Sequence, residues 1–317
     1  MKQGLKLQRW SVFCLGILMM AKGYCAPFNG FDVNDALIPI EKIMQGGPPK
    51  DGIPAIDHPR FVTADQARFL KPEDRVIGVS VNGIHKAYPI PILNWHEVVN
   101  DRFNDLAVVV TFCPLCGTGV VYETGRGDQA LEFGVSGLLY NSDVLLYDRG
   151  TESLWSQLKN QAVAGPLKGQ RMKMLASQLI PWSSWIEQFP DTVVLSVNTG
   201  YRRDYTRNPY SGYENSRGLY FPVEFLSYKY HPKERVIGLE YRGVIKAYPI
   251  AELAKSGSEG RILDTVAGEQ LTIDFNASDR NARIFTSLGE ELAVVNAFWF
   301  AWYAFYPDSD VYSHDNQ

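Results

Sequence analysis

Two stretches of this sequence match each other and decide its fold: DRVIGVSVNGIHKAYPIPIL at residues 74–93 and ERVIGLEYRGVIKAYPIAEL at residues 234–253. Eleven of the twenty positions are identical without a gap. Further along, residues 101–122 align with residues 264–285 after a shift of three residues. Within this region VVVTF aligns with LTIDF. A match of this length predicts two related domains that arose by internal duplication.

Each copy is predicted to begin with a β-hairpin. Residues 75–81 and 235–241 have the alternating pattern of strands. Asn82-Gly83 or Arg242-Gly243 follows, and Asn-Gly between two such runs is a strong hairpin signal. The second strand of each copy is expected to end at Tyr88-Pro89 or Tyr248-Pro249, because proline stops further ladder pairing.

The rest of the chain reads as an α+β, strand-rich fold. After Pro91 a helix is expected, because Ile92, Trp95, His96 and Val99 are spaced as one helix face, with Asn94 and Glu97 off it. A second, short helix is expected at 180–189, and the aromatic run 297–306 is read as buried core. Further strands are expected at residues 106–112, 120–123, 131–137, 144–147 and 192–197.

Residues 199–218 are rich in Arg, Asn, Tyr, Ser and Gly and indicate a domain boundary. The predicted organisation is a signal peptide at 1–25, a first domain at 26–200, a linker at 201–217 and a second, degenerate repeat domain at 218–317.

The N-terminus is typical of a secretory signal. Lys2, Lys6 and Arg9 precede an apolar run at residues 10–21, and small or turn-forming residues follow at 23–27. The run is too short for a membrane span. Cleavage near residues 23–26 would give a periplasmic or secreted protein without a stable membrane span. An uncleaved N-terminal anchor is the alternative.

Cleavage changes the charge and the cysteine count. It removes four of the 31 basic residues and none of the 35 acidic ones, so the formal charge changes from −4 to −8. No basic stripe offsets this charge, which argues against nucleic-acid binding. Cys14 and Cys25 also leave, so the mature protein keeps Cys113 and Cys116 in an oxidising compartment. No pattern in the sequence indicates a particular small-molecule or protein partner.

The distinctive motif is the knuckle Cys113-Pro114-Leu115-Cys116-Gly117. Two thiolates at this spacing can face one metal ion, as in the knuckles of rubredoxins and zinc ribbons. Those proteins use two knuckles, and no second pair exists here, so a metal would need nitrogen or oxygen ligands as well.

Two other interpretations of the knuckle stay open. One is a thiol–disulfide oxidoreductase, although a turn and a strand follow Cys116 where thioredoxin-like proteins begin a helix. The other is a non-catalytic scaffold or binding module with a structural cysteine pair. No Gly-rich phosphate loop, Ser-His-Asp order or His-Glu-x-x-His pattern is present, so the sequence specifies no reaction.

We expect a thiophilic metal, copper or zinc, bound by Cys113 and Cys116, with His96 as third ligand and Asp143 or water as fourth. An inward-facing histidine is nevertheless more often a core residue than a ligand. In the second copy Asn276 and Asp279 replace the two cysteines. His96 falls opposite residues 255–258, so all three candidates are lost together, as a shared site predicts.

A polar cluster follows the knuckle and supplies further candidate site residues: Tyr140, Asn141, Ser142, Asp143, Asp148 and Arg149. Loops often carry function. The alternative is structural, with a simple turn at residues 141–143 and an ion pair between Asp148 and Arg149.

These motifs resemble a bacterial family of domains of unknown function, family 3179. The resemblance rests on DGIPAIDHPRF (51–61), AYPIPILNWHEVVND (87–101), VVVTFCPLCGTGVVYE (108–123), FGVSGLLYNSDVLLYDRGTESLWSQ (133–157) and FWFAWYAFYPD (298–308). It implies that the family's histidine, cysteine pair and Tyr-Asn-Ser-Asp positions fall on His96, Cys113, Cys116 and residues 140–143. It implies no activity.

Overall fold

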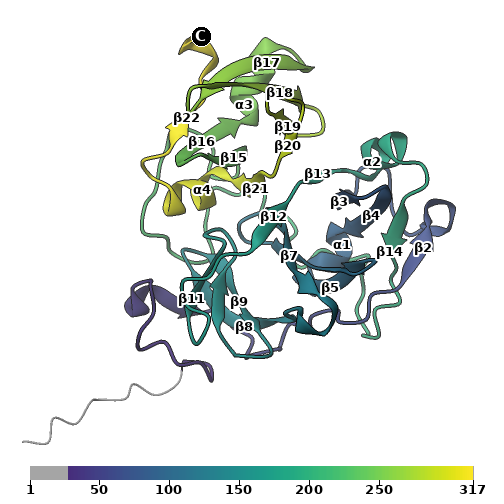
Figure 1. Ribbon diagram of the computed structural model, residues 1–317, viewed down its shortest axis with the longest axis vertical. Helices are drawn as coiled ribbons and strands as arrows, with labels where there is room; N and C mark the ends of the chain where they lie inside the picture. Colours follow the sequence, from purple (N-terminus) through teal and green to yellow (C-terminus); the bar gives the residue numbers. More distant parts are fainter. Residues whose placement is uncertain (1–27, 317) are drawn as a thin grey trace, which may run out of the picture.

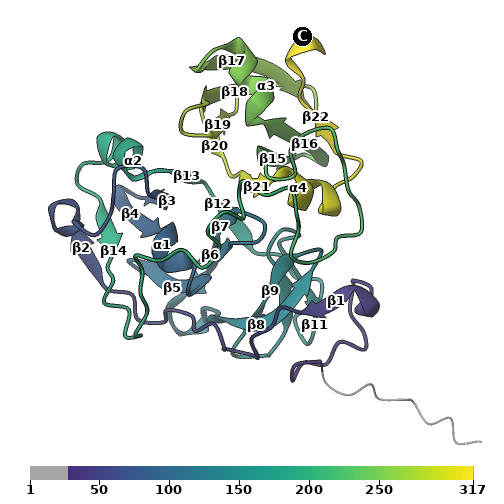
Figure 2. The ribbon, with the colours of Figure 1, turned by 180° about the vertical axis from the view of Figure 1, so that it is seen from behind.

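A computed structural model describes residues 28–316, so the expected signal peptide lies outside the described residues. Within residues 28–316 the chain forms four sheets with few, short helices, which confirms the α+β, strand-rich expectation (Figures 1 and 2). The α-helices are α1 (Ile90–Leu93), α2 (Trp182–Gln188), α3 (Ile250–Leu253) and α4 (Trp299–Phe305). The 3₁₀ helices are η1 (Ile40–Lys42), η2 (Ala64–Gln66), η3 (Gly127–Gln129), η4 (Ala254–Ser256) and η5 (His314–Asn316).

The two predicted hairpins are present at the expected bounds. They are β3 (Arg75–Val81) with β4 (Ile84–Pro89) and β15 (Arg235–Tyr241) with β16 (Val244–Pro249). Both turn residues are left-handed, with φ of 50° and 77° at Asn82-Gly83 and 48° and 83° at Arg242-Gly243. Two left-handed residues in succession make the type I′ turn that matches strand twist.

Each hairpin belongs to a larger sheet. The first sheet has the order β13 (Ser177–Pro181), β3, β4, β14 (Val193–Leu195) and β2 (Phe61–Thr63). The second, eight-stranded sheet has the order β22 (Asp310–Val311), β16, β15, β21 (Val295–Phe298), β7 (Thr118–Arg126), β6 (Leu106–Cys113) and β5 (Val98–Phe103), with β12 (Lys173–Leu175) paired to β7. A bridge between Asn296 and Gly119 joins its two halves, so strands from both sides of residues 201–217 share this sheet.

Two smaller sheets complete the fold. One has the order β1 (Ile43–Gln45), β8 (Phe133–Tyr140), β9 (Asp143–Asp148), β10 (Leu154–Ser156) and β11 (Gln161–Ala164). The other has the order β17 (Glu259–Val266), β18 (Glu269–Asn276), β19 (Asn281–Phe285) and β20 (Glu291–Leu292). Figure 1 shows β17–β20 at one end of the molecule, with β8 and β9 near the other end.

Elements of the two copies recur at nearly constant spacing. The bounds of β3, β4 and α1 return in β15, β16 and α3 after a shift of 160 positions, from 75 to 235. Those of β6 return in β18 after a shift of 163 positions, from 106 to 269. The domain bounds and the duplication itself stay predictions, and this recurrence is what a duplication would produce.

A lysine, a tyrosine and an aspartate form the same contacts in both copies. The lysine ammonium and the tyrosine hydroxyl both bond one oxygen of the aspartate, at 2.8 and 2.6 Å in the first copy and 2.6 and 2.9 Å in the second. The residues are Lys86, Tyr88 and Asp101, and Lys246, Tyr248 and Asp264.

The helix expected after Pro91 is wrong beyond its first turn. Helix α1 ends at Leu93, and Val99 lies in β5. Glu97 has a φ of 60°, which interrupts any helix, and Val99 forms a bridge with Ile56 while β5 pairs with β6. Tertiary pairing therefore overrides the apolar periodicity. The aromatic run 297–306 is core as expected, since Trp299 and Trp302 are buried in α4.

Candidate functional site

The cysteine knuckle connects two central strands. Strand β6 ends at Cys113 and β7 begins at Thr118, which faces Cys113 across the ladder. Gly117 has a φ of 59°, and a Cβ there would lie 2.7 Å from the ring of Phe298. The Phe298 N–H also donates to the Cys116 carbonyl at 2.8 Å, so β21 holds the knuckle from the C-terminal part of the chain. Glycine is required here by backbone conformation and by space.

The β8–β9 turn forms the opposite wall of the site. Asn141 and Ser142 are left-handed, with φ of 50° and 66°, so the predicted turn is present and Asp143 begins β9 directly after it. The Cys116 thiol donates to the Ser142 carbonyl at 3.2 Å, and the Cys113 thiol lies 3.8 Å from the same oxygen. The turn therefore presents a carbonyl to both sulfurs.

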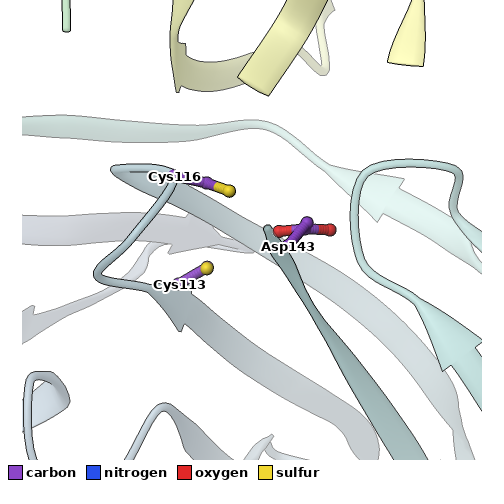
Figure 3. A group of neighbouring side chains, drawn as sticks. All are labelled: Cys113, Cys116 and Asp143. Carbon is purple, nitrogen blue, oxygen red and sulfur yellow. The ribbon is translucent and has the colours of Figure 1, made fainter. Parts of the chain in front are cut away.

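The structure brings Cys113, Cys116 and Asp143 together. One potential ligand atom from each residue lies within 4.8 Å of the others, and Figure 3 shows both sulfurs on the side of the knuckle that faces the carboxylate. All three side chains are at most 1% exposed. Both thiols are free, and no disulfide joins them.

Burial controls the protonation of these groups. It raises the pKa of both thiols, and carboxylate neighbours add to the shift. Burial also raises the pKa of Asp143 to about 7, although hydrogen bonding from backbone N–H groups, that of Leu158 first, opposes this shift. The Leu158 N–H donates to Oδ2 at 3.0 Å, whereas the buried Oδ1 has no partner. One oxygen of the site thus has lone pairs free for a ligand.

Glu97 is a site residue that sequence reasoning missed. It is 7% exposed, and burial followed by the charge of Asp143 raises its pKa to about 8. Its carbonyl accepts the Phe112 N–H at 2.8 Å, which fixes it beside the strand that carries Cys113. The helix expected after Pro91 places Glu97 off the apolar face and therefore away from the core. The sequence NWHE at residues 94–97, which lies in one of the stretches that carry the family resemblance, is the sequence signal for this position.

His96 is fully buried as expected, but the structure does not bring it into the group of thiols and Asp143. Its Nδ1–H donates to the Pro54 carbonyl at 2.8 Å, and its Nε2 accepts from the Tyr205 hydroxyl at 2.7 Å. Burial lowers the pKa of His96, and the charge of Arg203 adds to this. Both nitrogens are engaged, so His96 is a neutral core histidine that ties three segments together.

Two of the remaining predicted residues frame the site. Tyr140 packs edge-on against Phe305 at a centroid distance of 5.4 Å. The Asn141 side chain donates to the Ala304 carbonyl at 3.1 Å and accepts the Glu224 N–H at 2.9 Å. These contacts hold the β8–β9 turn against α4 and the segment before β15.

Asp148 and Arg149 do not pair with each other, so this part of the structural alternative is wrong. The buried Asp148 accepts the Trp155 Nε1–H at 3.0 Å and the Thr151 N–H at 2.7 Å. Arg149 forms an ion pair with Asp57 at 3.1 Å. Strand β9 ends at Asp148, and Arg149 lies in the turn that follows, where its N–H donates to the Glu132 carbonyl at 2.8 Å.

A buried lysine lies near the thiols and was also missed. Lys233 is 1% exposed, and its ammonium donates to the Ser216 and Gly218 carbonyls at 3.1 and 2.7 Å. It lies 4.1 Å from the centroid of the Tyr213 ring. Burial lowers the pKa of Lys233 to about 8, while Cys116 acts in the opposite direction. The ammonium is placed to offset negative charge on that sulfur.

A family model described as "Protein of unknown function (DUF3179)" matches residues 50–309. Neither the curated proteins nor the solved structures give a match. Among the helices of residues 28–316, none combines the length and apolarity that a bilayer crossing requires.

Proposed function

Because the chain belongs to the DUF3179 family, whose description gives no activity, we propose a function from the site alone: a buried transition-metal site formed by Cys113, Cys116 and Asp143. The observation that carries the proposal is the convergence of two sulfurs and one carboxylate oxygen within 4.8 Å. Bound zinc lies ~2.3 Å from sulfur and ~2.1 Å from oxygen, so its ligand atoms come this close together.

The donor chemistry favours a thiophilic ion. Two thiolates with one carboxylate suit zinc or copper and disfavour magnesium or calcium. The Ser142 carbonyl, which both thiols already face, is the nearest candidate for a fourth ligand. Three deprotonated ligands exceed the charge of a divalent ion by one, and Lys233 offers a compensating cation. Full burial suits a closed site that retains its metal.

Elemental analysis of the purified, reduced protein after loading with zinc or copper tests the proposal. We expect about one ion per chain in the wild type and the loss of most of it in Cys113→Ser and Asp143→Asn, because each change removes a ligand. The matched control is His96→Gln, a substitution of a buried polar residue outside the cluster, which should retain its metal. Wild-type protein that binds neither metal while both thiols titrate would refute the site.

A thiol–disulfide function is the second candidate, and one observation favours it. Asp143, with a pKa near neutrality, lies beside both thiols and could take up a thiol proton. Against it, burial raises the pKa of both thiols, which reduces the reactive thiolate fraction. Metal-free protein isolated with the two cysteines oxidised, which mass spectrometry detects as the loss of two hydrogens, would favour this candidate over the metal site.

We also propose that the protein is exported and processed near residues 23–26, which places it in the periplasm or outside the cell. Intact-mass measurement of the protein from its native host should give a chain that begins at one of these positions. Arg9→Glu, which weakens the basic start of the signal, should reduce processing, and Arg171→Glu serves as a control of equal charge change. An intact Met1 terminus on the wild-type protein would refute cleavage.

A further inference from the structure

A cavity of about 470 Å³ lies behind the cysteine knuckle. Pro114 and Gly117 line it, whereas the two sulfurs do not. Arg75 and Arg235 also line it, and they are the first residues of β3 and β15. The cavity is therefore bounded by both hairpins, and the volume is within the range of small-ligand pockets.

The two arginines occupy the same position in the two matching segments, DRVIG and ERVIG. The Arg75 guanidinium donates to the carbonyls of Asp279, at 2.9 Å, and Leu179. The Arg235 guanidinium donates to the Gly117 carbonyl at 3.0 Å and to Glu214 at 3.4 Å. Nε of each arginine is buried without a partner. A guanidinium has five N–H groups, so both retain donors.

Positive charge exceeds negative charge at this place. Glu214 accepts ion pairs from both Arg235 and Arg280, the latter at 2.7 Å, while the ion pairs of the described residues include none with Arg75. Arg235 is only 4% exposed. Burial and then the charges of Arg235 and Arg280 lower the pKa of Arg75, and the charges of Glu214 and Asp279 oppose this shift only in part. A bound anion would relieve this repulsion.

Three other acidic side chains near the cavity form no ion pair with Arg75 or Arg235 in the described part of the chain. Glu73 is exposed, and Asp74 accepts the Lys71 N–H at 2.8 Å. The Asp279 carboxylate accepts from the Ser184 hydroxyl at 2.8 Å. None of these carboxylates forms an ion pair with Arg75 or Arg235 among the ion pairs of residues 28–316.

Much of the remaining lining is apolar. Phe112, Leu179 and Phe298 contribute to it together with Ile92 and Pro114. Such a wall accommodates a hydrocarbon or aromatic body, while the guanidiniums orient a planar or tetrahedral oxyanion.

We propose that this cavity binds a small organic anion whose carboxylate or phosphate group lies between Arg75 and Arg235 and whose apolar body packs on the adjoining wall. The Arg235–Gly117 hydrogen bond connects this anion site to the back of the knuckle. The site is separate from the metal ligands, so it stands or fails independently of the metal proposal.

Titration calorimetry of the mature protein with benzoate, phenyl phosphate and neutral benzamide tests this site. We expect saturable binding of at least one anion and none of benzamide. The tighter of the two anions identifies the preferred head group. Arg75→Gln should weaken anion binding by ~10-fold or more, since a charge-assisted hydrogen bond is lost. Arg171→Gln, which removes an exposed arginine paired with Glu240, should bind as the wild type does.

Two further variants keep the result interpretable. Arg235→Lys retains the charge but loses the planar fork, and it should also weaken binding if Arg75→Gln fails to fold. Cys113→Ser should bind the anions normally, because its sulfur does not line the cavity. The proposal would be overturned if neither anion binds natively folded wild-type protein, or if Arg75→Gln and Arg235→Lys both bind the anions as tightly as the wild type does.

Discussion

The Gly238→Ala protein is expected to lose about 3 kcal/mol of unfolding free energy, since overpacking of a rigid core is costly. A Cβ at position 238 would lie 1.9 Å from the Trp302 ring. That ring cannot easily move, because its Nε1–H donates to the Ser309 hydroxyl at 3.0 Å and it packs on Tyr306. Urea denaturation monitored by tryptophan fluorescence measures the loss as a lower midpoint.

The first copy supplies a parallel test. Gly78 matches Gly238 in the repeat, and a Cβ there would lie 2.2 Å from the Trp185 ring, so Gly78→Ala should be similarly destabilising. Gly150→Ala is the control, because its Cβ would meet no atom closer than 3.8 Å. That change should stay within ~0.5 kcal/mol of the wild type. A soluble Gly238→Ala protein with the wild-type midpoint would show that Trp302 can shift.

The hairpins could be predicted from sequence to the residue, because local chemistry decides them. Alternating residues fix β3 and β15, and the turn pairs Asn82-Gly83 and Arg242-Gly243 adopt the left-handed conformations that join them to β4 and β16. The helix beyond Leu93 could not be predicted correctly. The same apolar spacing fits a turn that leads into a buried strand, and the choice between them depends on the distant Ile56 and on β6.

The candidate site was predictable where spacing alone carries the information. Cys113 and Cys116 share a five-residue knuckle, and the polar cluster after it offers Asp143 as a possible ligand. The inward direction of His96 predicts a ligand, but burial does not distinguish a metal ligand from a histidine that bonds Pro54 and Tyr205. Arg75 and Arg235 were not recognised as site residues, because a charged residue at the start of a strand usually faces solvent.

Glu97→Gln should change how the stability of the metal-free protein depends on pH. The pKa of Glu97 is raised from its ordinary value near 4.5 to about 8 in the folded protein, mainly by burial. The folded state therefore binds this proton more tightly than the unfolded state. The stabilisation is complete below about pH 4.5 and is lost as the pH rises toward 8, a decline of roughly 2–4 kcal/mol.

Glutamine keeps the size and polarity of the side chain and cannot ionise. The variant should match the wild type in unfolding free energy near pH 5 and exceed it by ~2–4 kcal/mol near pH 8, measured by urea denaturation in the presence of a chelator. Part of the pH dependence should remain, because burial raises the pKa of Asp143 in the same direction.

Glu41→Gln, a change at an exposed glutamate, should reproduce the wild-type profile and controls for the loss of one charge. Identical pH profiles for Glu97→Gln and the wild type would mean that Glu97 reaches solvent when it ionises. The surroundings of Glu97 and Cys113 would then be open to water, which contradicts a closed metal site. A steeper profile in the wild type would instead establish that these surroundings exclude water, and buried thiolates require a cation under that condition.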